Sequence, residues 1–204
     1  MTRRSGATTR SRRAAVEQQV LGAVERLLTD GESFTALPVG RIADEAGMAR
    51  TTFYGHFPDK STLLMRLTET ATAELFARAA GWAGDDDGTR EEHVAVVQDL
   101  IAEYRAHAPL LQALVEVAAY ESEVAAFWHR RIDDVADVLR RRIGRDRRAG
   151  RSAADGDPRI TASMIVWGTE RSIAHHVATA PPSADAAFAR GVAAATWTAL
   201  GLPT

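Results

Sequence analysis

A short polar segment in the first third of the chain carries residue types that bind nucleic acids. Arginine makes bidentate contacts with guanine, and threonine offers a methyl group to thymine or a hydroxyl group to phosphate. Tyrosine and lysine reach phosphates, which positions a protein on a duplex without reading its sequence. We therefore expect contacts with double-stranded DNA from Arg50, Thr51, Thr52, Tyr54, His56 and Lys60.

Two short helical patterns around a tight turn are expected to hold these side chains. The inner side of the first pattern is made of Val39, Ile42, Ala43 and Ala46. Gly47 ends this pattern, because glycine is a helix-stop residue. In the second pattern, Phe53 and Phe57 lie one turn apart and form the inner face. This arrangement predicts a helix-turn-helix, in which the second helix enters the major groove and the first braces it.

The rest of the sequence also has helical periodicity, which predicts an all-α fold of nine helices. The fourth helix is expected over residues 60–80, with a polar loop at 81–88 after it. Residues 144–156 have no apolar period, so we expect a flexible loop there. No alternating run of strand length bounded by turn signals is present.

Composition excludes several kinds of site. The 204 residues include no cysteine, which excludes disulfides, thiolate zinc sites and cysteine nucleophiles. No apolar stretch is long enough to span a membrane, and none follows the N-terminal arginines as a secretion signal requires. We expect a cytoplasmic protein with no metal, no cofactor and no membrane partner.

Charge is distributed unevenly, although the net charge is only −2. Residues 1–70 contain ten basic and eight acidic side chains, whereas the other 134 contain 15 and 19. The first 15 residues carry five arginines and no acidic residue. This pattern fits a small DNA-facing head on an acidic body, with residues 1–15 either a solvated arm or a further DNA contact.

The last two expected helices differ from the others. Residues 158–177 are apolar on more than one side, and residues 184–200 are rich in alanine and glycine. A helix that is apolar all round must be buried on several sides. These are either central helices of a monomer or a homodimer interface. We expect the homodimer, because no later segment is left to cover them.

The head resembles the DNA-binding domain of the TetR/AcrR family of bacterial repressors. The matching positions are Ile42-Ala43, Ala46-Gly47, Met48, Thr52-Phe53-Tyr54, His56-Phe57 and Pro58-Asp59-Lys60. The resemblance covers about 45 residues, and the nine-helix plan is similar to that of the family. It implies a flexible basic arm at 1–15, a helix-turn-helix DNA-binding domain at 16–60, and a ligand-binding and dimerisation domain at 61–204.

The head departs from the family pattern at two positions. Ala49 stands where the family usually has a serine or threonine that caps the recognition helix, and losing such a cap costs about 1 kcal/mol. Gly55 replaces a larger side chain that often faces DNA. Gly40 also weakens the first helix of the motif, by about 0.5–1 kcal/mol relative to alanine.

The body resembles, more weakly, the actinobacterial EthR-type branch of the family. The similar parts are residues 118–128, the segment Thr169-Glu170-Arg171-Ser172, and Trp197. That branch binds long apolar ligands in a tunnel, which implies a hydrophobic or amphipathic small-molecule effector. The expected lining is Leu100, Ile101, Tyr104, Leu114, Trp128, Val135, Thr169, Glu170 and Trp197.

The resemblance implies a homodimeric repressor that leaves a near-palindromic operator when its effector binds. An activator, or a regulator that answers to a protein partner, is the alternative that the sequence leaves open. An enzyme is a third class, because His107, His129 and the pair His175-His176 could serve acid–base or metal chemistry. We expect core or surface histidines instead, since adjacent histidines point in different directions on a helix and no carboxylate–histidine arrangement lies on a clear helix face. A purely helical interaction module would leave the polar face at Arg50 to His56 without a role.

Overall fold

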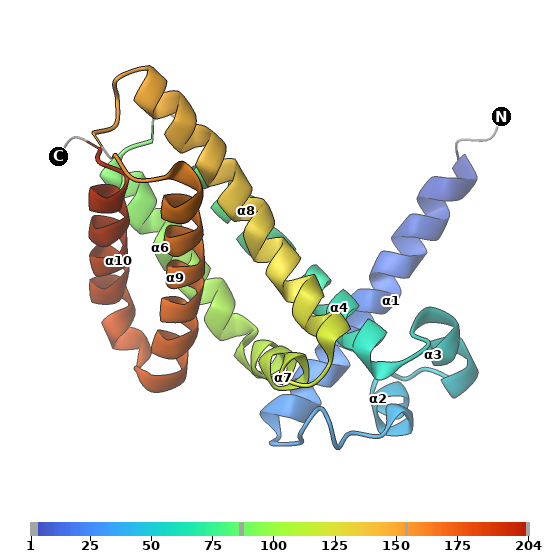
Figure 1. The fold of residues 1–204 in the computed structure, drawn as a ribbon. Coiled ribbons are helices and arrows are strands. Elements are labelled where there is room, and N and C mark those ends of the chain that lie inside the picture. The colour runs from blue at the N-terminus through green and yellow to red at the C-terminus, as the bar shows by residue number, and fades with distance from the viewer. Residues whose placement is uncertain (1–3, 86–87, 154, 203–204) are drawn as a thin grey trace. The chain divides into compact units, whose positions relative to one another are not determined.

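The computed structural model describes residues 4–85, 88–153 and 155–202. All regular structure in these ranges is helical, which confirms the all-α prediction (Figure 1). The helices are α1 (Arg4–Thr29), α2 (Val39–Glu45), α3 (Arg50–His56), α4 (Lys60–Ala71), α5 (Ala73–Gly84), α6 (Arg90–Ala106), α7 (Ala108–Ala118), α8 (Ser122–Arg148), α9 (Pro158–Thr179), the 3-10 turn η1 (Pro182–Ala184) and α10 (Asp185–Ala199). None of the described helices is long and apolar enough to cross a membrane.

Backbone contacts divide the chain into two compact units. The first consists of Met1–Thr72 with Pro109–Phe127, and the second of Ala73–Ala108 with Trp128–Thr204. The first unit therefore contains α4 and α7 in addition to the expected helix-turn-helix, and α8 contributes residues to both units. The functional domain limits at residues 15 and 60 stay predictions.

The first unit is built around the apolar faces of α1 to α4. Gly31 adopts φ 90° after α1, a conformation that suits glycine, and the chain turns there. Asp59 caps α4 by accepting a hydrogen bond of 2.6 Å from the Thr62 N–H. The buried side chains of this core include Val20, Val24, Leu27, Phe34, Ile42, Phe53, Phe57, Leu63, Leu64 and Leu67.

The helix predicted over residues 60–80 is two helices, so the described residues contain ten α-helices and not nine. Thr72 separates α4 from α5 and has non-helical dihedral angles, φ −102° and ψ 9°. Its hydroxyl donates a hydrogen bond of 2.7 Å to the Thr68 carbonyl. The Thr72 N–H donates to the same carbonyl at 2.9 Å, and a threonine hydroxyl that bonds back in this way bends a helix.

Three helices are longer than predicted. α5 continues to Gly84, so the polar loop predicted at 81–88 begins later. α8 continues to Arg148, so the predicted loop at 144–156 begins later; arginine is a good helix former, and the turn comes at Gly150, with φ 70°. α1 begins at Arg4, so most of the segment predicted as a flexible arm is helical. Only residues 1–3 of that arm lie outside the described part of the chain.

The second unit consists of α5, α6, most of α8, α9 and α10. A capping box opens α6: the Glu92 N–H donates to the Thr89 hydroxyl at 3.2 Å, and the Thr89 N–H donates to the Glu92 carboxylate at 2.7 Å. Asp157 caps α9 through the Arg159 N–H at 2.8 Å. One apolar cluster of this unit is formed by Ala83, Val135, Leu139, Ile143, Ala162 and Leu200.

Candidate functional site

The turn between α2 and α3 holds the two helices of the motif at a fixed separation. Gly47 adopts φ 62°, a left-handed conformation that favours glycine. Its N–H donates to the Asp44 carbonyl at 3.0 Å, and the Met48 N–H donates to the Ala43 carbonyl at 2.9 Å. The end of α2 is thereby closed by hydrogen bonds, and the chain is directed into α3.

α3 is anchored by aromatic packing and by polar contacts to it and to the end of α2. Phe53 and Phe57 are buried, with ring centroids 5.2 Å apart. Gln19 of α1 donates to the carbonyl of Ala46, the C-cap residue of α2, at 2.5 Å. Arg66 of α4 donates to the His56 carbonyl at 2.8 Å, which satisfies an acceptor in the last turn of α3. These contacts fix the direction in which the outer face of α3 points.

The outer face of α3 presents most of the predicted DNA-contacting residues to solvent. Arg50, Thr51, Thr52 and Tyr54 are exposed, Tyr54 by 52%, and His56 is half-buried. The Arg50 guanidinium lies against Gly40 of α2, where an added Cβ atom would overlap it. Gly40 therefore makes room for Arg50, a role that helix propensity alone does not indicate.

The Lys60 side chain lies against the connection between α1 and α2, and its contact with DNA stays a prediction. Its ammonium group donates hydrogen bonds to the carbonyls of Phe34 at 2.6 Å, Thr35 at 2.9 Å and Leu37 at 2.8 Å. It also lies 5.1 Å from the centroid of the Phe34 ring. Partial burial lowers the pKa of Lys60. Because an ammonium group has three N–H donors and all three are used, Lys60 ties down the α1–α2 connection in this structure.

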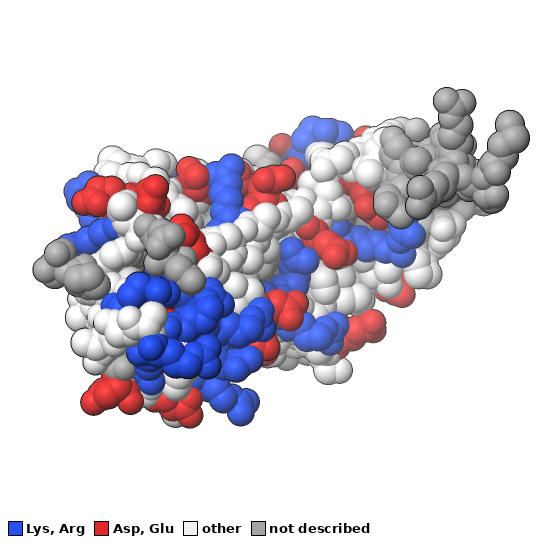
Figure 2. All heavy atoms as spheres, turned by 90° about the horizontal axis from the view of Figure 1, so that it is seen from above, with Lys and Arg blue, Asp and Glu red and all other residues white. Residues whose placement is uncertain are grey.

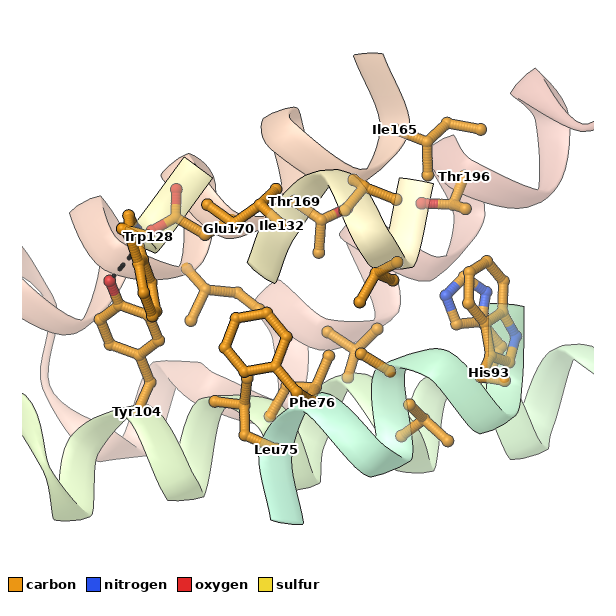
Figure 3. A pocket seen from close by; sticks show the side chains of 18 residues that line it. Leu75, Phe76, His93, Tyr104, Trp128, Ile132, Ile165, Thr169, Glu170 and Thr196 are labelled. Carbon is orange, nitrogen blue, oxygen red and sulfur yellow. Dashed lines mark hydrogen bonds between the residues drawn. The ribbon is translucent and has the colours of Figure 1, made fainter. Parts of the chain in front are cut away.

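The second unit encloses an apolar cavity of about 80 Å³ among α5, α6, α8, α9 and α10 (Figure 3). Six of the nine predicted ligand-binding residues line it: Leu100, Tyr104, Trp128, Val135, Thr169 and Glu170. The other three do not. Ile101 and Trp197 are buried elsewhere in this unit, and Leu114 belongs to the core of the first unit through α7.

Twelve further lining residues were not predicted. Most are apolar residues that look like ordinary core positions in the sequence: Leu75, Phe76, Ala79, Trp82, Val96, Val97, Ile132, Ile165, Val166 and Ile173. His93 and Thr196 complete the lining. Only their position in the folded structure distinguishes these residues from other core residues. Helical periodicity shows which residues are buried, but it does not show which of them line a cavity.

One end of the cavity carries a buried polar pair. The Tyr104 hydroxyl donates to the Glu170 carboxylate at 3.2 Å, as the dashed line in Figure 3 shows. Burial raises the pKa of Glu170, and the nearby charge of Arg171 opposes this effect. Arg171 Nε lies 3.2 Å from the second carboxylate oxygen without hydrogen-bond alignment. The indole N–H of Trp128, at the same end, has no hydrogen-bond partner among the described residues.

The other end of the cavity carries His93, which sequence reasoning missed. Its ring stacks on Trp82 with centroids 3.9 Å apart, and its Nδ1 atom has no hydrogen-bond partner in the described part of the chain. Burial, together with the charge of Arg142, lowers the pKa of His93 to about 4. The imidazole is therefore neutral at physiological pH, and it adds a polar atom to an otherwise apolar wall.

Comparison with known proteins agrees with this geometry. Residues 28–67 match the family model described as bacterial regulatory proteins, tetR family. The chain carries a TetR-family DNA-binding domain. The TetR match includes the end of α1, the whole helix-turn-helix and most of α4. No curated protein matches the chain by sequence.

Solved structures of TetR-family regulators share this fold over about nine-tenths of the chain. GusR of Salmonella enterica is 18% identical, with 91% of this chain and 95% of that chain covered and a TM-score of 0.69. FadR of Bacillus subtilis, in complex with stearoyl-CoA, is 15% identical, with 88% and 96% covered and a TM-score of 0.71. SmeT, in complex with triclosan, is 18% identical, with 91% of each chain covered and a TM-score of 0.71. The weaker likeness to the EthR-type branch stays a prediction.

The two departures from the TetR pattern are visible in α3. Ala49 is the N-cap residue and makes no side-chain hydrogen bond, so the cap is missing as expected. Gly55 is exposed, and a Cβ atom added there would meet no other atom within 4 Å. The outer face of α3 therefore has a gap beside Tyr54.

The histidines that raised the question of an enzyme are dispersed. His129 packs edge-on against Trp167, and the His176 Nε2 atom lies 2.8 Å from the Asp185 carboxylate. His175 is exposed, and His107 ends α6. Among the described residues, no group of three His, Cys, Asp or Glu side chains is placed to hold a metal ion.

Proposed function

We propose that this protein is a non-enzymatic, homodimeric repressor that acts in the cytoplasm on operator DNA and releases it when a small molecule binds the second unit. The observation that carries the proposal is a fixed helix-turn-helix with an exposed polar face, on a chain whose other compact unit encloses an apolar cavity. Two heads in a dimer would read successive major grooves of a near-palindromic site. The effector must bind one arrangement of the dimer better than the other, because equal binding shifts nothing.

We assign the DNA contacts to Arg50, Thr51, Thr52, Tyr54 and His56. The first four are exposed on one helix whose opposite face is buried. Arginine and threonine supply base-edge contacts, and tyrosine supplies a phosphate contact. Lys60 is assigned a positioning role, because its three donors are already used.

We propose an effector that is mostly apolar and has one hydrogen-bond donor. The walls of the cavity are almost entirely apolar, and the Glu170 carboxylate, which lies 3.2 Å from Arg171 Nε, supplies acceptor oxygens at one end. Neighbours of the same fold hold triclosan and stearoyl-CoA, both with large apolar parts. A cavity of about 80 Å³ must widen to admit such a molecule, so binding requires side chains such as Phe76 to move.

The homodimer is expected to form through α9 and α10. α9 exposes Ile160 by 61% and Met164 by 70%, four residues apart and so on one face. α10 exposes Gly191 and Ala195, also four residues apart, and the two helices pack against each other. Exposed apolar side chains beside small residues favour close approach of a second copy.

The DNA assignment is tested with the duplex that lies upstream of the protein's own gene. Replacing Arg50 and Tyr54 by alanine should reduce binding at least about 100-fold, since each lost contact removes about 1–3 kcal/mol. The matched control replaces Arg130 and Tyr120, which are also exposed, and should bind like the wild type. Unchanged binding by the Arg50/Tyr54 variant at physiological salt would show that α3 is not the reading helix.

The effector site is tested with N-phenyl-1-naphthylamine, an apolar fluorescent amine with one N–H donor. The wild type should enhance its fluorescence, and Val166→Trp, which fills the cavity, should abolish the enhancement. Val115→Trp adds the same ring at an exposed position and serves as the control. If Val166→Trp binds the probe as well as the control does, the cavity is not the effector site.

A further inference from the structure

The strongest concentration of charge in the molecule lies at the C-terminal end of α8. Seven of the twelve residues from Arg140 to Arg151 are arginines, and only Asp146 opposes them. Figure 2, which looks onto the upper end of α8 in Figure 1, shows a dense group of basic side chains bordered by acidic ones. Neither the helix-turn-helix nor the apolar cavity uses this group.

Two of these arginines have a structural role. Arg142 is 1% exposed; its Nε donates to the Asp146 carboxylate at 3.3 Å and its Nη1 to the Trp82 carbonyl at 3.0 Å. Arg151 donates to the other oxygen of Asp146 at 2.6 Å. Asp146 is thus fully engaged inside the unit, and its charge is not available to the surface.

Four of the other five line an open hollow of about 520 Å³ between the end of α8 and the start of α9, and Arg147 does not. Of these four, Arg145 also donates to the Gly84 carbonyl at 3.1 Å. Its lining contains five arginines and one aspartate: Arg140, Arg141, Arg145, Arg148, Arg159 and Asp157. Gly144 lies among them, and an added Cβ atom there would meet no other atom within 4 Å. The absence of a side chain at this position leaves space between the guanidinium groups.

Helix electrostatics explains only part of this arrangement. Arg145 and Arg148 lie in the last turn of α8, where cations are favourable. Arg159 lies in the first turn of α9, where a cation is unfavourable, yet it faces the same hollow. Its presence adds a like charge to the group from α8, and the positive end of α9 adds to the field.

Few carboxylates compensate the charge of the hollow. Arg140 pairs with Asp137 at 3.0 Å, and Asp157 is engaged as the cap of α9. Within the described ranges, Arg141, Arg148 and Arg159 are exposed and have no ion-pair partner. A group of uncompensated guanidinium ions around a concavity is the arrangement expected for an anion site.

We propose that this hollow binds a small molecule that carries two or more phosphate groups. Guanidinium groups bind phosphate through paired N–H donors, and several of them converge here from two helices. The concave shape and the acidic border, which includes Asp137 and Asp157, favour a compact anion over a long duplex. The apolar cluster around Leu139, Ile143 and Ala162 fills the interior beneath α8, so the phosphate site is separate from the effector cavity.

The test uses inorganic tripolyphosphate and the full chain. Isothermal titration should give saturable binding that weakens with added salt. Replacing Arg141 and Arg159 by alanine should lower the affinity at least about tenfold, since contacts to charged groups are each worth about that much. Replacing Arg90 and Arg130, which are exposed elsewhere in the same unit, removes the same charge and should leave the affinity unchanged.

Three outcomes would overturn the proposal. Equal loss in both double variants would show that tripolyphosphate responds only to net charge. No saturable binding by the wild type would exclude the site. The Arg141/Arg159 variant is also tested with a random-sequence DNA duplex. If it binds the duplex more weakly but binds tripolyphosphate as the wild type does, the hollow is a nucleic-acid site. Circular dichroism on each variant ensures that the folded protein is measured.

Discussion

The ammonium group of Lys60 shows how much a single side chain determines in the head. Three backbone carbonyls converge on it from the α1–α2 connection, at 2.6, 2.9 and 2.8 Å. A compact group with three donors matches this arrangement, whereas the planar fork of arginine does not. This geometry explains why the chain keeps its single lysine here beside 24 arginines.

Lys60→Met and Lys60→Arg should both destabilise the protein. Each change leaves at least one of the three carbonyls without a hydrogen-bond donor. We therefore expect the free energy of unfolding to fall by about 1–3 kcal/mol. Urea denaturation followed by circular dichroism measures it, with Arg130→Met as the control. If Lys60→Met weakens duplex binding without changing the unfolding curve, Lys60 contacts phosphate as first predicted.

His93 should make the stability of the protein depend on pH. Its pKa is about 4 in the folded chain and 6.5 when solvated, so between these values the unfolded state binds more protons. Stability should therefore fall as the pH drops from 6.5 to 4, by at most about 3 kcal/mol. Denaturation at pH 7 and pH 4.5 measures the loss, which should be smaller in His93→Asn. Equal losses in both proteins would rule out His93 as the cause.

At the scale of elements, local sequence signals located most of the helices. The helix end at Gly47 was predicted correctly, because a helix stop depends on residues that are close in sequence. The break at Thr72 was missed, because the apolar pattern continues through it. The extension of α8 was missed for the opposite reason. Its last turns have no apolar period, yet arginine still supports a helix.

The recognition helix α3 should gain stability from a restored cap. Ala49 has extended dihedral angles, φ −65° and ψ 139°, that suit a capping side chain. Ala49→Ser should raise the free energy of unfolding by about 1 kcal/mol. Ala102→Ser, at an exposed position inside α6, is the control and should be neutral or slightly destabilising. Urea denaturation distinguishes the two, and no gain at position 49 would mean that the α3 N–H groups are already satisfied.

At the scale of the whole molecule, the sequence predicted which helix faces are apolar. It was less successful in predicting which of these faces line the cavity. Tyr104, Trp128 and Glu170 line the cavity, as the expected lining had it. Leu114 was misplaced, because its helix α7 joins the first unit although the next helix in the sequence enters the second. Membership of a unit depends on tertiary contacts, and periodicity along one helix carries no information about them.

The dimer proposal has its own test at this scale. Met164→Asp places a charge on an exposed apolar face of α9 and should shift the protein from dimer to monomer. Gly191→Phe should do the same on α10 by blocking close approach. Multi-angle light scattering measures the mass, and Tyr120→Asp, at an exposed aromatic position in the first unit, is the control. An unchanged mass for both the α9 and the α10 variant would show that the dimer interface lies elsewhere.

The contact between Gly40 and Arg50 ties together two positions that lie ten residues apart. A larger residue at position 40 would displace the guanidinium, although residue 40 itself lies on the bracing helix. Related sequences should therefore change these two positions together. A redesign of Arg50 therefore has to consider position 40 as well. The size of a residue on α2 then sets where the guanidinium at the start of α3 comes to rest.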